Sequence, residues 1–481
     1  MHQNRPFYLV SLLLLSGYAI YLLARIISIP ITHDEAGTIL NFSTQSVWDI
    51  VTYKDPIPNN HILHTLLVKG FTGIFGYSEL VCRLPNFIGG ILYWIFGFLI
   101  VRRLSERNAI LTIAGILLLM ANPYVIEFFG LARGYGLSIA WIMVSLYLLI
   151  RSEAKYWIGS LLFAGIAVYT NLTLLNYFIP LTSLVTFLII LRSGHQRNLN
   201  LTLVILLFVL VVLSISLPVY KMVTTEQFQY WGTTGFYSDT FLPLLQASLM
   251  NKRYLGVNTV EIVSGVILLF AFLSALRAIQ ILGRMKKGAF FRPDVQLGYL
   301  FFATIAYNIF QNIGFNIPNL NARTALLFYP LFILSTYGML LGLPWTPLKK
   351  MILILPFLVL ALWHIKTSFN LHSAYEWWYD GDNKKVMKLL VEDHSSSGER
   401  DIVVFKCNWL FQPSLTYYST IYYQGKVAPP PYSKTIDTTE KVDYYYILAE
   451  DKNNWFDRNY TVLQSFAWDS RYLMKRIRRN D

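Results

Sequence analysis

Runs of about twenty apolar residues recur along this chain of 481 residues, and they restrict the folds that are open to it. A helix needs roughly 20 apolar residues to cross a hydrocarbon core about 30 Å thick. Hydrophobic residues make up 55% of the chain and charged residues 14%, whereas soluble domains carry roughly 25% charged residues. The sequence therefore predicts a mainly α-helical, polytopic membrane bundle with eleven spans, at about 7–29, 79–101, 109–128, 131–150, 156–172, 173–191, 199–219, 259–280, 295–313, 322–342 and 350–368.

The net charge of +13 is explained by topology. Lys and Arg collect in the cytoplasmic loops of membrane proteins. With the N-terminus in the cytoplasm, the predicted inner segments carry fifteen basic residues against three acids, and the outer loops are balanced or acidic. An odd number of spans then places the C-terminal segment outside. No nucleic-acid partner is needed to account for the charge. The short loops and only two cysteines favour a bacterial inner membrane, and an archaeal membrane stays open as an alternative.

The chain divides in composition near residue 368. Residues 1–368 form the predicted transmembrane domain, with long outer loops at 30–78 and 220–258. Residues 369–481 hold fifteen basic and fifteen acidic residues, so their formal charge is zero. Alternating stretches in this tail predict strands and helices that would form a small extracytoplasmic α/β domain. The strands are expected at 401–407, 442–449 and 460–467, and the helices at 383–392 and 412–423.

Polar and ionisable side chains recur at the predicted outer ends of the apolar segments. They are Asp34 and Glu35 after the first span, Asn60, His61 and His64 at the start of an apolar helix, Arg83 in the second span, Arg133 and Tyr135 at the fourth, and Arg323 at the tenth. Such residues are costly at a membrane and are candidates for function. A carboxylate can remove a proton from an acceptor hydroxyl. Guanidinium groups bind phosphate oxygens and stabilise the charge that develops on a departing phosphate.

Each of these residues also has a structural explanation. Asp34 and Glu35 suit the first turn of a helix, here an interfacial helix expected over residues 36–51. The histidines could be ordinary interfacial side chains, and the arginines could extend to the lipid headgroups. Their occurrence together on one side of the membrane is what favours a joint function.

The ordered motifs resemble those of the GT-C membrane glycosyltransferases, which include protein O-mannosyltransferases and lipid A aminoarabinose transferases. His33-Asp34-Glu35-Ala36 is similar to the Asp-Glu pair in the first outer loop of that family, and residues 75–85 resemble its FG…E…RLP stretch. Arg133-Gly134-Tyr135 resembles its Arg-x-Tyr motif, and Arg323 is similar to its late Arg ahead of a Pro-bearing helix. The motifs cover about 30–135 and 319–332, and the similarity of topology covers 1–368.

The resemblance implies an enzyme that transfers a sugar from a polyprenyl phosphate to an acceptor at the outer membrane face, usually with inversion. It implies that Asp34 is the general base, that Glu35 assists or positions the acceptor, and that Arg133 and Arg323 hold the lipid phosphate. Tyr135 and Arg83 complete the substrate-binding candidates.

One motif departs from the family. Where its members have Glu-Lys-Pro-Pro or a His-Pro-Pro type sequence, this chain has Asn60-His61-Ile62-Leu63, so phosphate contact falls to Asn60, His61 or His64. The sugar and the acceptor, whether glycan, lipid or protein, stay open. No cofactor is required, although the carboxylates of Asp34 and Glu35 also suit a hard divalent cation.

Two alternatives share this charge pattern. A transporter or flippase would need polar groups along the depth of the bundle, together with inverted repeats and broken helices. The inner halves of the predicted spans are apolar and show no repeat. A ligase or polymerase of lipid-linked glycans is chemically closer, but it would use a diphosphate donor.

Overall fold

The structure is a computed structural model, and the residues that it describes are 5–192, 196–227, 232–252, 254, 258–283, 287–396, 401–439, 442–467 and 470–477. Parts of the predicted outer loop 220–258, namely residues 228–231, 253 and 255–257, lie outside the described residues.

The chain forms two compact units, each built from separate stretches of sequence. The first unit comprises Met1–Leu23, Ser46–Leu67 and Leu84–Phe369. The second comprises Ala24–Gln45, Val68–Arg83 and Asn370–Asp481. The tail beyond residue 370 is therefore joined in the second unit by two early segments, one of which contains Asp34 and Glu35 and the other Arg83.

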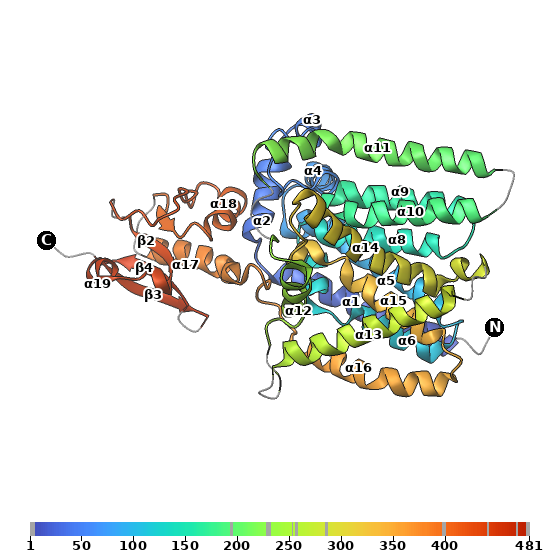
Figure 1. Ribbon diagram of the computed structural model, residues 1–481. Coiled ribbons are helices and arrows are strands. Elements are labelled where there is room, and N and C mark those ends of the chain that lie inside the picture. The colour runs from blue at the N-terminus through green and yellow to red at the C-terminus, as the bar shows by residue number, and fades with distance from the viewer. Residues whose placement is uncertain are drawn as a thin grey trace. The chain divides into compact units, whose positions relative to one another are not determined.

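The first unit is helical (Figure 1). Three helices contribute residues to both units: α1 (Arg5–Ser28), α4 (Ile62–Phe75) and α5 (Glu79–Leu104). The others in the first unit are α3 (Val47–Val51), α6 (Ala109–Met120), α7 (Pro123–Glu127), α8 (Gly134–Leu149), α9 (Ala154–Thr170), α10 (Leu175–Leu191), α11 (Arg197–Thr224), α12 (Leu242–Ser248), α13 (Thr259–Leu282), α14 (Pro293–Phe315), α15 (Phe328–Leu341) and α16 (Pro347–Thr367).

The helices of the first unit differ in how far they are buried. α8 is buried on almost every side and packs against α9, which in turn contacts α10 and α11 (Figure 1). α11, α13 and α16 instead expose most of their apolar side chains, including Leu206, Leu210 and Leu213 on α11. An apolar helix with an exposed surface suits contact with lipid.

All eleven predicted apolar runs lie on helices. Among the described residues, seven helices are long and apolar enough to cross a membrane, or eight if one bent pair counts as a single span. That pair bends by 72° between α6 and the segment Pro123–Gly130. The side chain of Asn122 caps the second part and Pro123 begins it, because proline cannot continue a preceding helix but suits a first turn. The chain is an integral membrane protein, and the count of eleven crossings stays a prediction.

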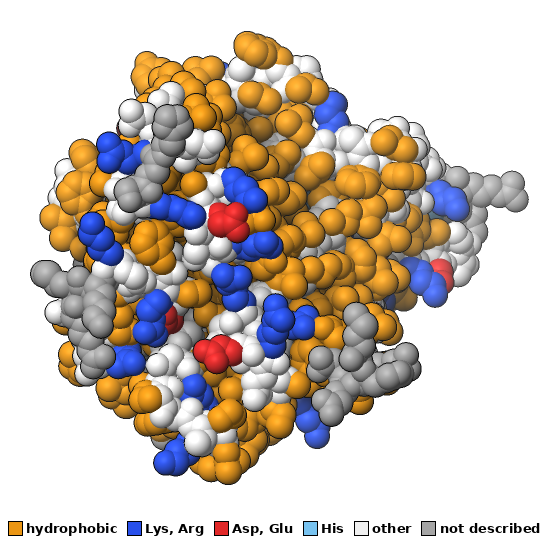
Figure 2. Space-filling model, turned by 90° about the vertical axis from the view of Figure 1, so that its right-hand side faces the viewer, with side chains coloured by type: hydrophobic (Ala, Val, Ile, Leu, Met, Phe, Trp, Pro, Cys, Tyr) orange, Lys and Arg blue, Asp and Glu red, His pale blue; other side chains and the backbone are white. Residues whose placement is uncertain are grey.

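Basic side chains gather on one face of the helical unit. Figure 2 views the side on which the N-terminal end of the chain lies, and Lys and Arg are far more common there than Asp and Glu. The last turn of α5, for example, carries Arg102 and Arg103. The sequence predicts a face rich in Lys and Arg on the cytoplasmic side, and the structure has one such face. Which side of the membrane this face lies on stays a prediction.

The predicted interfacial helix is interrupted. α2 (His33–Ala36) continues into a π-helical turn, η2 (Gly37–Phe42), and α3 begins only at Val47. The Ser46 hydroxyl accepts a hydrogen bond from the backbone N–H of Asp49 at 3.1 Å, which makes Ser46 the cap of a separate helix. Residues 36–51 therefore do not form the single helix expected from the sequence.

The described C-terminal part of the second unit is a four-stranded sheet with three α-helices. The strands are β1 (Phe405–Cys407), β2 (Tyr444–Leu448), β3 (Tyr460–Phe466) and β4 (Arg471–Arg476), in the order β1-β2-β4-β3. β1 pairs with β2 in parallel, and the other pairs are antiparallel. The helices are α17 (Asn383–Ser396), α18 (Gln412–Ile421) and the short α19 (Asn454–Asn459). α18 packs against both α17 and α2. The predicted strands and helices of the tail are present, and β4 and α19 are additions to them.

Candidate active site

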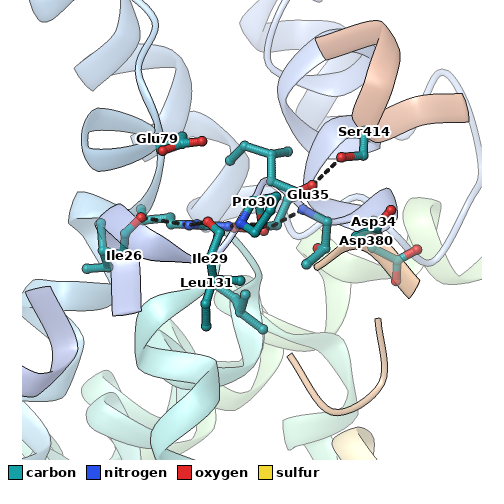
Figure 3. A network of polar contacts seen from close by, with 12 residues as sticks. Ile26, Ile29, Pro30, Asp34, Glu35, Glu79, Leu131, Asp380 and Ser414 are labelled. Atoms are coloured by element: carbon teal, nitrogen blue, oxygen red, sulfur yellow. Dashed lines mark hydrogen bonds and ion pairs between the residues drawn. The ribbon is translucent and has the colours of Figure 1, made fainter. Parts of the chain in front are cut away.

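The two acids that follow α1 have different surroundings. Glu35 is fully buried and forms an ion pair with the fully buried Arg83. Nε of Arg83 donates to Glu35 Oε1 and Nη2 donates to Oε2, both at 2.7 Å (Figure 3). A carboxylate and a guanidinium that meet through two parallel hydrogen bonds form one of the strongest polar pairs in proteins. Glu35 is thereby fixed on both of its oxygens.

The remaining N–H groups of Arg83 bind the end of α1. Nη1 donates to the carbonyls of Ile26 and Ile29 at 2.8 and 2.7 Å, and Nη2 donates to that of Pro30 at 2.8 Å. The last carbonyls of a helix have no partner within the helix, and a basic side chain there satisfies them and complements the helix dipole. The five N–H donors of an arginine are all engaged at Arg83. The sequence places Arg83 among the substrate-binding candidates. In the structure its hydrogen bonds instead join α5 to the end of α1 and to Glu35.

Glu35 also caps α2. Its Oε2 accepts a hydrogen bond from the backbone N–H of Thr32 at 2.9 Å. A Glu at the third helical position that reaches back to the cap residue is one half of a capping box. The helix-capping explanation considered for the pair of acids thus applies to Glu35.

Asp34 lies beside this fixed point and is half-buried. Successive side chains on a helix point about 100° apart, since one turn takes 3.6 residues. The side chain of Asp34 is therefore directed differently from that of Glu35, while its backbone is held by the same turn. The hydroxyl of Thr38 also donates to the Asp34 carbonyl at 3.2 Å. A carboxylate on a short, firmly bonded turn is well suited to act on a substrate from a defined position.

In the first unit, Arg133 is held by a residue that the sequence did not single out. Its Nη2 donates to Asn59 Oδ1 at 2.5 Å, and its Nη1 donates to the Asn59 carbonyl at 3.3 Å. The guanidinium carbon also lies 5.7 Å from the centre of the Tyr135 ring, in reach of a cation–π interaction. Arg133 is almost fully buried, so its charge is little screened by water.

Asn60, the neighbouring asparagine, has a structural role instead. Its Nδ2 donates to the Ile50 carbonyl at 2.9 Å, and its Oδ1 accepts from the Thr65 hydroxyl at 3.1 Å. The Tyr53 hydroxyl donates to the Asn60 carbonyl. These bonds fix the loop ahead of α4. Of the two adjacent asparagines it is Asn59, rather than Asn60, that contacts a candidate arginine, and the doubled Asn-Asn was the only sign of it in the sequence.

His61 and His64 are buried and electrically neutral. α4, with 14 residues, is not among the helices long enough to cross a membrane. Burial lowers the pKa of His61 well below its usual value, and the positive charges of Arg133 and Arg323 lower it further. Burial and the charge of Arg133 lower the pKa of His64 to about 3. Within the described part of the chain, neither ring nitrogen of His64 has a hydrogen-bond partner, nor does Nε2 of His61. Buried polar atoms of this kind call for a ligand or water.

Gly134 makes the close approach of these residues sterically feasible. A Cβ atom at this position would lie 2.3 Å from the Thr170 carbonyl oxygen and 2.6 Å from Cγ of His61. The His61 ring meets the Tyr135 ring edge to face, with centroids 4.9 Å apart. The glycine of the Arg-Gly-Tyr motif therefore lets His61 approach the segment that carries Arg133 and Tyr135.

Arg323 belongs to the same electrostatic group. It lies in a short 3-10 turn, η7 (Ala322–Ala325), and it is half-buried. Ala322, directly before it, has a φ of +41°, a conformation uncommon for residues other than glycine. The first unit thus brings His61, His64, Arg133, Tyr135 and Arg323 together, and the second unit brings together Asp34, Glu35 and Arg83.

The described residues offer little to a metal ion. No group of three or more His, Cys, Asp or Glu side chains among them is arranged to hold one. Both oxygens of Glu35 are bound by Arg83, so Glu35 does not pair with Asp34 as a second carboxylate ligand. The pair as arranged does not fit a divalent cation.

Two comparisons with known proteins gave matches. The family model of dolichyl-phosphate-mannose-protein mannosyltransferases matches residues 58–236. The fold matches the crystal structure of ArnT from Cupriavidus metallidurans bound to undecaprenyl phosphate, with a TM-score of 0.50, 13% identity and coverage of 96% of this chain and 97% of that one. It also matches ArnT from the same organism in the apo state, with a TM-score of 0.51, 12% identity and the same coverage of both chains. No curated protein sequence matches the chain.

The matched segment 58–236 contains His61, His64, Arg133 and Tyr135, and the likeness in fold extends over nearly the whole of both chains. The chain is an integral membrane protein whose fold is similar to that of ArnT, and its residues 58–236 match the model of a mannosyltransferase family.

Proposed function

We propose that this enzyme transfers a sugar from a polyprenyl-phosphate donor to an acceptor hydroxyl at the outer face of the membrane, with inversion and with Asp34 as the general base. The observation that carries the proposal is the position of Asp34, which lies half-buried on the short turn that Glu35 caps and that Arg83 holds through Glu35. We further propose a bacterial inner membrane, with the N-terminus in the cytoplasm and residues 370–481 outside.

In the proposed reaction, the Asp34 carboxylate accepts the proton of the acceptor hydroxyl. The acceptor oxygen then forms a bond to the anomeric carbon as the bond between that carbon and the phosphate oxygen breaks. The electron pair of the broken bond leaves with the polyprenyl phosphate, whose negative charge rises by one. A positioned base contributes about 10²- to 10⁴-fold to such a proton transfer.

Arg133 and Arg323 would bind the donor phosphate and stabilise its growing charge. Hydrogen bonds from guanidinium to phosphate are strong, and they are stronger still where water is excluded. His61 and His64, being neutral, can each donate one N–H without adding a further positive charge. Tyr135 remains a substrate-binding candidate beside Arg133. Arg83 and Glu35 instead position the turn that carries Asp34, and Asn60 positions the loop ahead of α4.

Support for a lipid phosphate comes from the likeness to the ArnT structure that contains undecaprenyl phosphate. The first experiment measures the affinity of the purified protein for undecaprenyl phosphate and for undecaprenyl diphosphate. Arg133→Gln should weaken binding of the monophosphate by about 10- to 100-fold, because hydrogen bonds to charged groups contribute about 1.5–3 kcal/mol.

Arg151→Gln is the matched control, since Arg151 hydrogen-bonds to Tyr147 and Tyr156 near the opposite end of α8. It should leave the affinity unchanged. Equal affinity of wild type and Arg133→Gln for the monophosphate would show that Arg133 does not bind the donor phosphate. Tighter binding of the diphosphate would instead favour a ligase or polymerase of lipid-linked glycans.

A transporter is the second candidate, and one observation favours it. α14 is not uniformly apolar along its length: Gln296, Thr304 and Asn308 are buried, and Asn308 donates to Asn176 at 3.2 Å. Movement of a labelled polyprenyl-phosphate sugar across sealed vesicles, without release of free polyprenyl phosphate, would support transport; sugar transfer with release of the lipid phosphate supports the enzyme.

A further inference from the structure

Three consecutive backbone N–H groups precede Asp34, and a side chain holds each of them. Tyr418 accepts the N–H of Ile31 at 2.8 Å, Glu35 accepts that of Thr32 at 2.9 Å, and Asp380 accepts that of His33 at 2.7 Å. The first N–H groups of a helix have no partner within the helix, and here they are satisfied by specific side chains. Two of the three acceptors come from the segment 370–481, nearly 350 residues or more further along the chain.

Further contacts from the same segment reach this turn. Ser414 Oγ donates to the carbonyl of Ile31 at 2.5 Å (Figure 3). The Nδ1 atom of His33 lies 2.9 Å from the carbonyl oxygen of Leu410, and the His33 ring meets the Trp409 ring edge to face. Ser414 and Tyr418 lie on α18, four residues apart and so on one face of it, and that helix packs against α2.

Asp380 is itself firmly held. It is 1% exposed, and its Oδ1 accepts a hydrogen bond from Asn383, which is completely buried. Burial raises the pKa of Asp380 well above its usual value, and the nearby carboxylate of Glu35 raises it further. A buried carboxyl group is costly unless its hydrogen bonds are satisfied, and here one bond goes to its own segment and the other to the turn that carries Asp34.

The turn is therefore held from two directions within the second unit. Arg83 and Glu35 fix the side that faces the end of α1. Asp380, Ser414 and Tyr418 fix the backbone of residues 31–33 from the side of the C-terminal segment. Asp34 is the next residue, so the direction of its carboxylate depends on both sets of contacts.

We propose that Asp380 is a positioning residue for the reaction: through the N–H of His33 it fixes the turn that presents Asp34, and the C-terminal segment is thereby part of the catalytic machinery. This rests on the proposed role of Asp34 as base. Asp380 touches neither sugar nor phosphate in this scheme, and its effect is transmitted entirely by the backbone of residues 33 and 34.

The test compares Asp380→Ala, which removes the acceptor, with Asp380→Asn, which keeps an acceptor oxygen of the same size. Displacement of a catalytic group by about 1 Å can cost about 10²-fold in rate. Asp380→Ala should lower kcat by about 10- to 100-fold, while KM for the donor changes by less than about threefold. Asp380→Asn should restore kcat to within about fivefold of wild type.

Asp393→Asn is the matched control. Asp393 lies on α17 and pairs with Lys475 and Tyr444, away from residues 31–35. It should leave kcat unchanged. If Asp380→Ala does not fold, Ser414→Ala takes its place and should lower kcat with KM unchanged.

Two further measurements separate this proposal from the proposed function. In an Asp34→Asn background, Asp380→Ala should cause little additional loss, because residues that act as one unit are not additive. Hydrogen exchange of the His33 N–H should become faster in Asp380→Ala and stay unchanged in Asp393→Asn, whatever reaction the enzyme catalyses. Unchanged exchange together with unchanged kcat overturns the proposal, as does an equal fold-loss in the wild-type and Asp34→Asn backgrounds. A fully active Asp34→Asn overturns the proposed base, whereas the exchange result still decides whether Asp380 holds the turn.

Discussion

Glu35 and Arg83 meet through two hydrogen bonds of 2.7 Å, and neither side chain is exposed to solvent. The two residues are 48 positions apart in sequence, and the same guanidinium also binds three carbonyls at the end of α1. These contacts hold the segment between the end of α1 and α2 in one conformation. Asp34, which adjoins the pair, inherits a defined position while remaining half-buried.

Removal of Arg83 should be strongly destabilising. Breaking a buried ion pair from one side leaves an uncompensated charge and costs about 3–5 kcal/mol. Arg83→Ala should accordingly unfold at a clearly lower temperature than wild type in the same detergent. Lys54→Ala provides the comparison, because Lys54 and Asp49 form an exposed pair at 3.9 Å, and such pairs contribute at most about 1 kcal/mol. Equal unfolding temperatures for the two variants would contradict the role given to Arg83.

Acid should destabilise the protein through its buried histidines. Their pKa values are lowered in the folded state, that of His64 to about 3. The unfolded chain therefore takes up protons below about pH 6.5 while the folded chain does not. Stability from this source is complete above that pH and is lost as the pH falls toward the folded-state values, by up to about 1.4 kcal/mol per pH unit for each histidine.

The measurement is the free energy of unfolding at pH 7.5, 6 and 5 for wild type and His64→Asn. The variant should show a shallower loss of stability below pH 6.5, because it has one fewer group to protonate on unfolding. Parallel pH dependences for the two proteins would mean that His64 is not held neutral.

Asn59→Ala tests a residue that only the structure identifies. Without the Asn59 side chain, Arg133 loses its bond at 2.5 Å and becomes less well oriented. A single hydrogen bond contributes about 0.5–1.5 kcal/mol, so the affinity for undecaprenyl phosphate should fall by about 2- to 10-fold. Undiminished affinity in Asn59→Ala would show that Arg133 needs no such support.

Gly134→Ala should damage the histidine cluster. The added methyl group would lie 2.3 Å from the Thr170 carbonyl oxygen, so the backbone must move. Overpacking of this kind costs about 1–3 kcal/mol. A lower unfolding temperature and weaker binding of undecaprenyl phosphate are both expected, whereas Gly17→Ala, where a Cβ atom meets nothing within 4 Å, should change neither. An unaltered unfolding temperature for Gly134→Ala would contradict the close packing around His61.

Hydrophobic patterning predicted the long helices and three of the four strands, whereas residues 36–51 do not form the single helix expected and α19 was not predicted. The fourth strand, β4, was missed because Arg471, Lys475 and Arg476 make it look like a charged tail. Arg471 is in fact 1% exposed and pairs with Asp382 at 2.7 Å. A buried charge is recognisable only with its partner, and here the partner lies 89 residues earlier.

The sequence suggested candidate site residues but gave no indication of their contacts. The sequence does not distinguish Asp34 from Glu35, or Asn59 from Asn60, because two adjacent residues of similar chemistry fit a sequence motif equally well. Long-range contacts make the distinction: Arg83 binds Glu35, and Arg133 binds Asn59. The contribution of Asp380 depends on a hydrogen bond across 347 residues, which no local pattern indicates.

Turnover of purified Asp34→Asn with a polyprenyl-phosphate sugar tests the central claim most directly. The substitution keeps the size of the side chain and removes its basicity. The proposed mechanism predicts that kcat falls by about two to four powers of ten, that the affinity for undecaprenyl phosphate stays within about threefold, and that Asp49→Asn, in the same outer loop, is fully active. Near-normal kcat in a folded Asp34→Asn protein would contradict the assignment of Asp34 as the base.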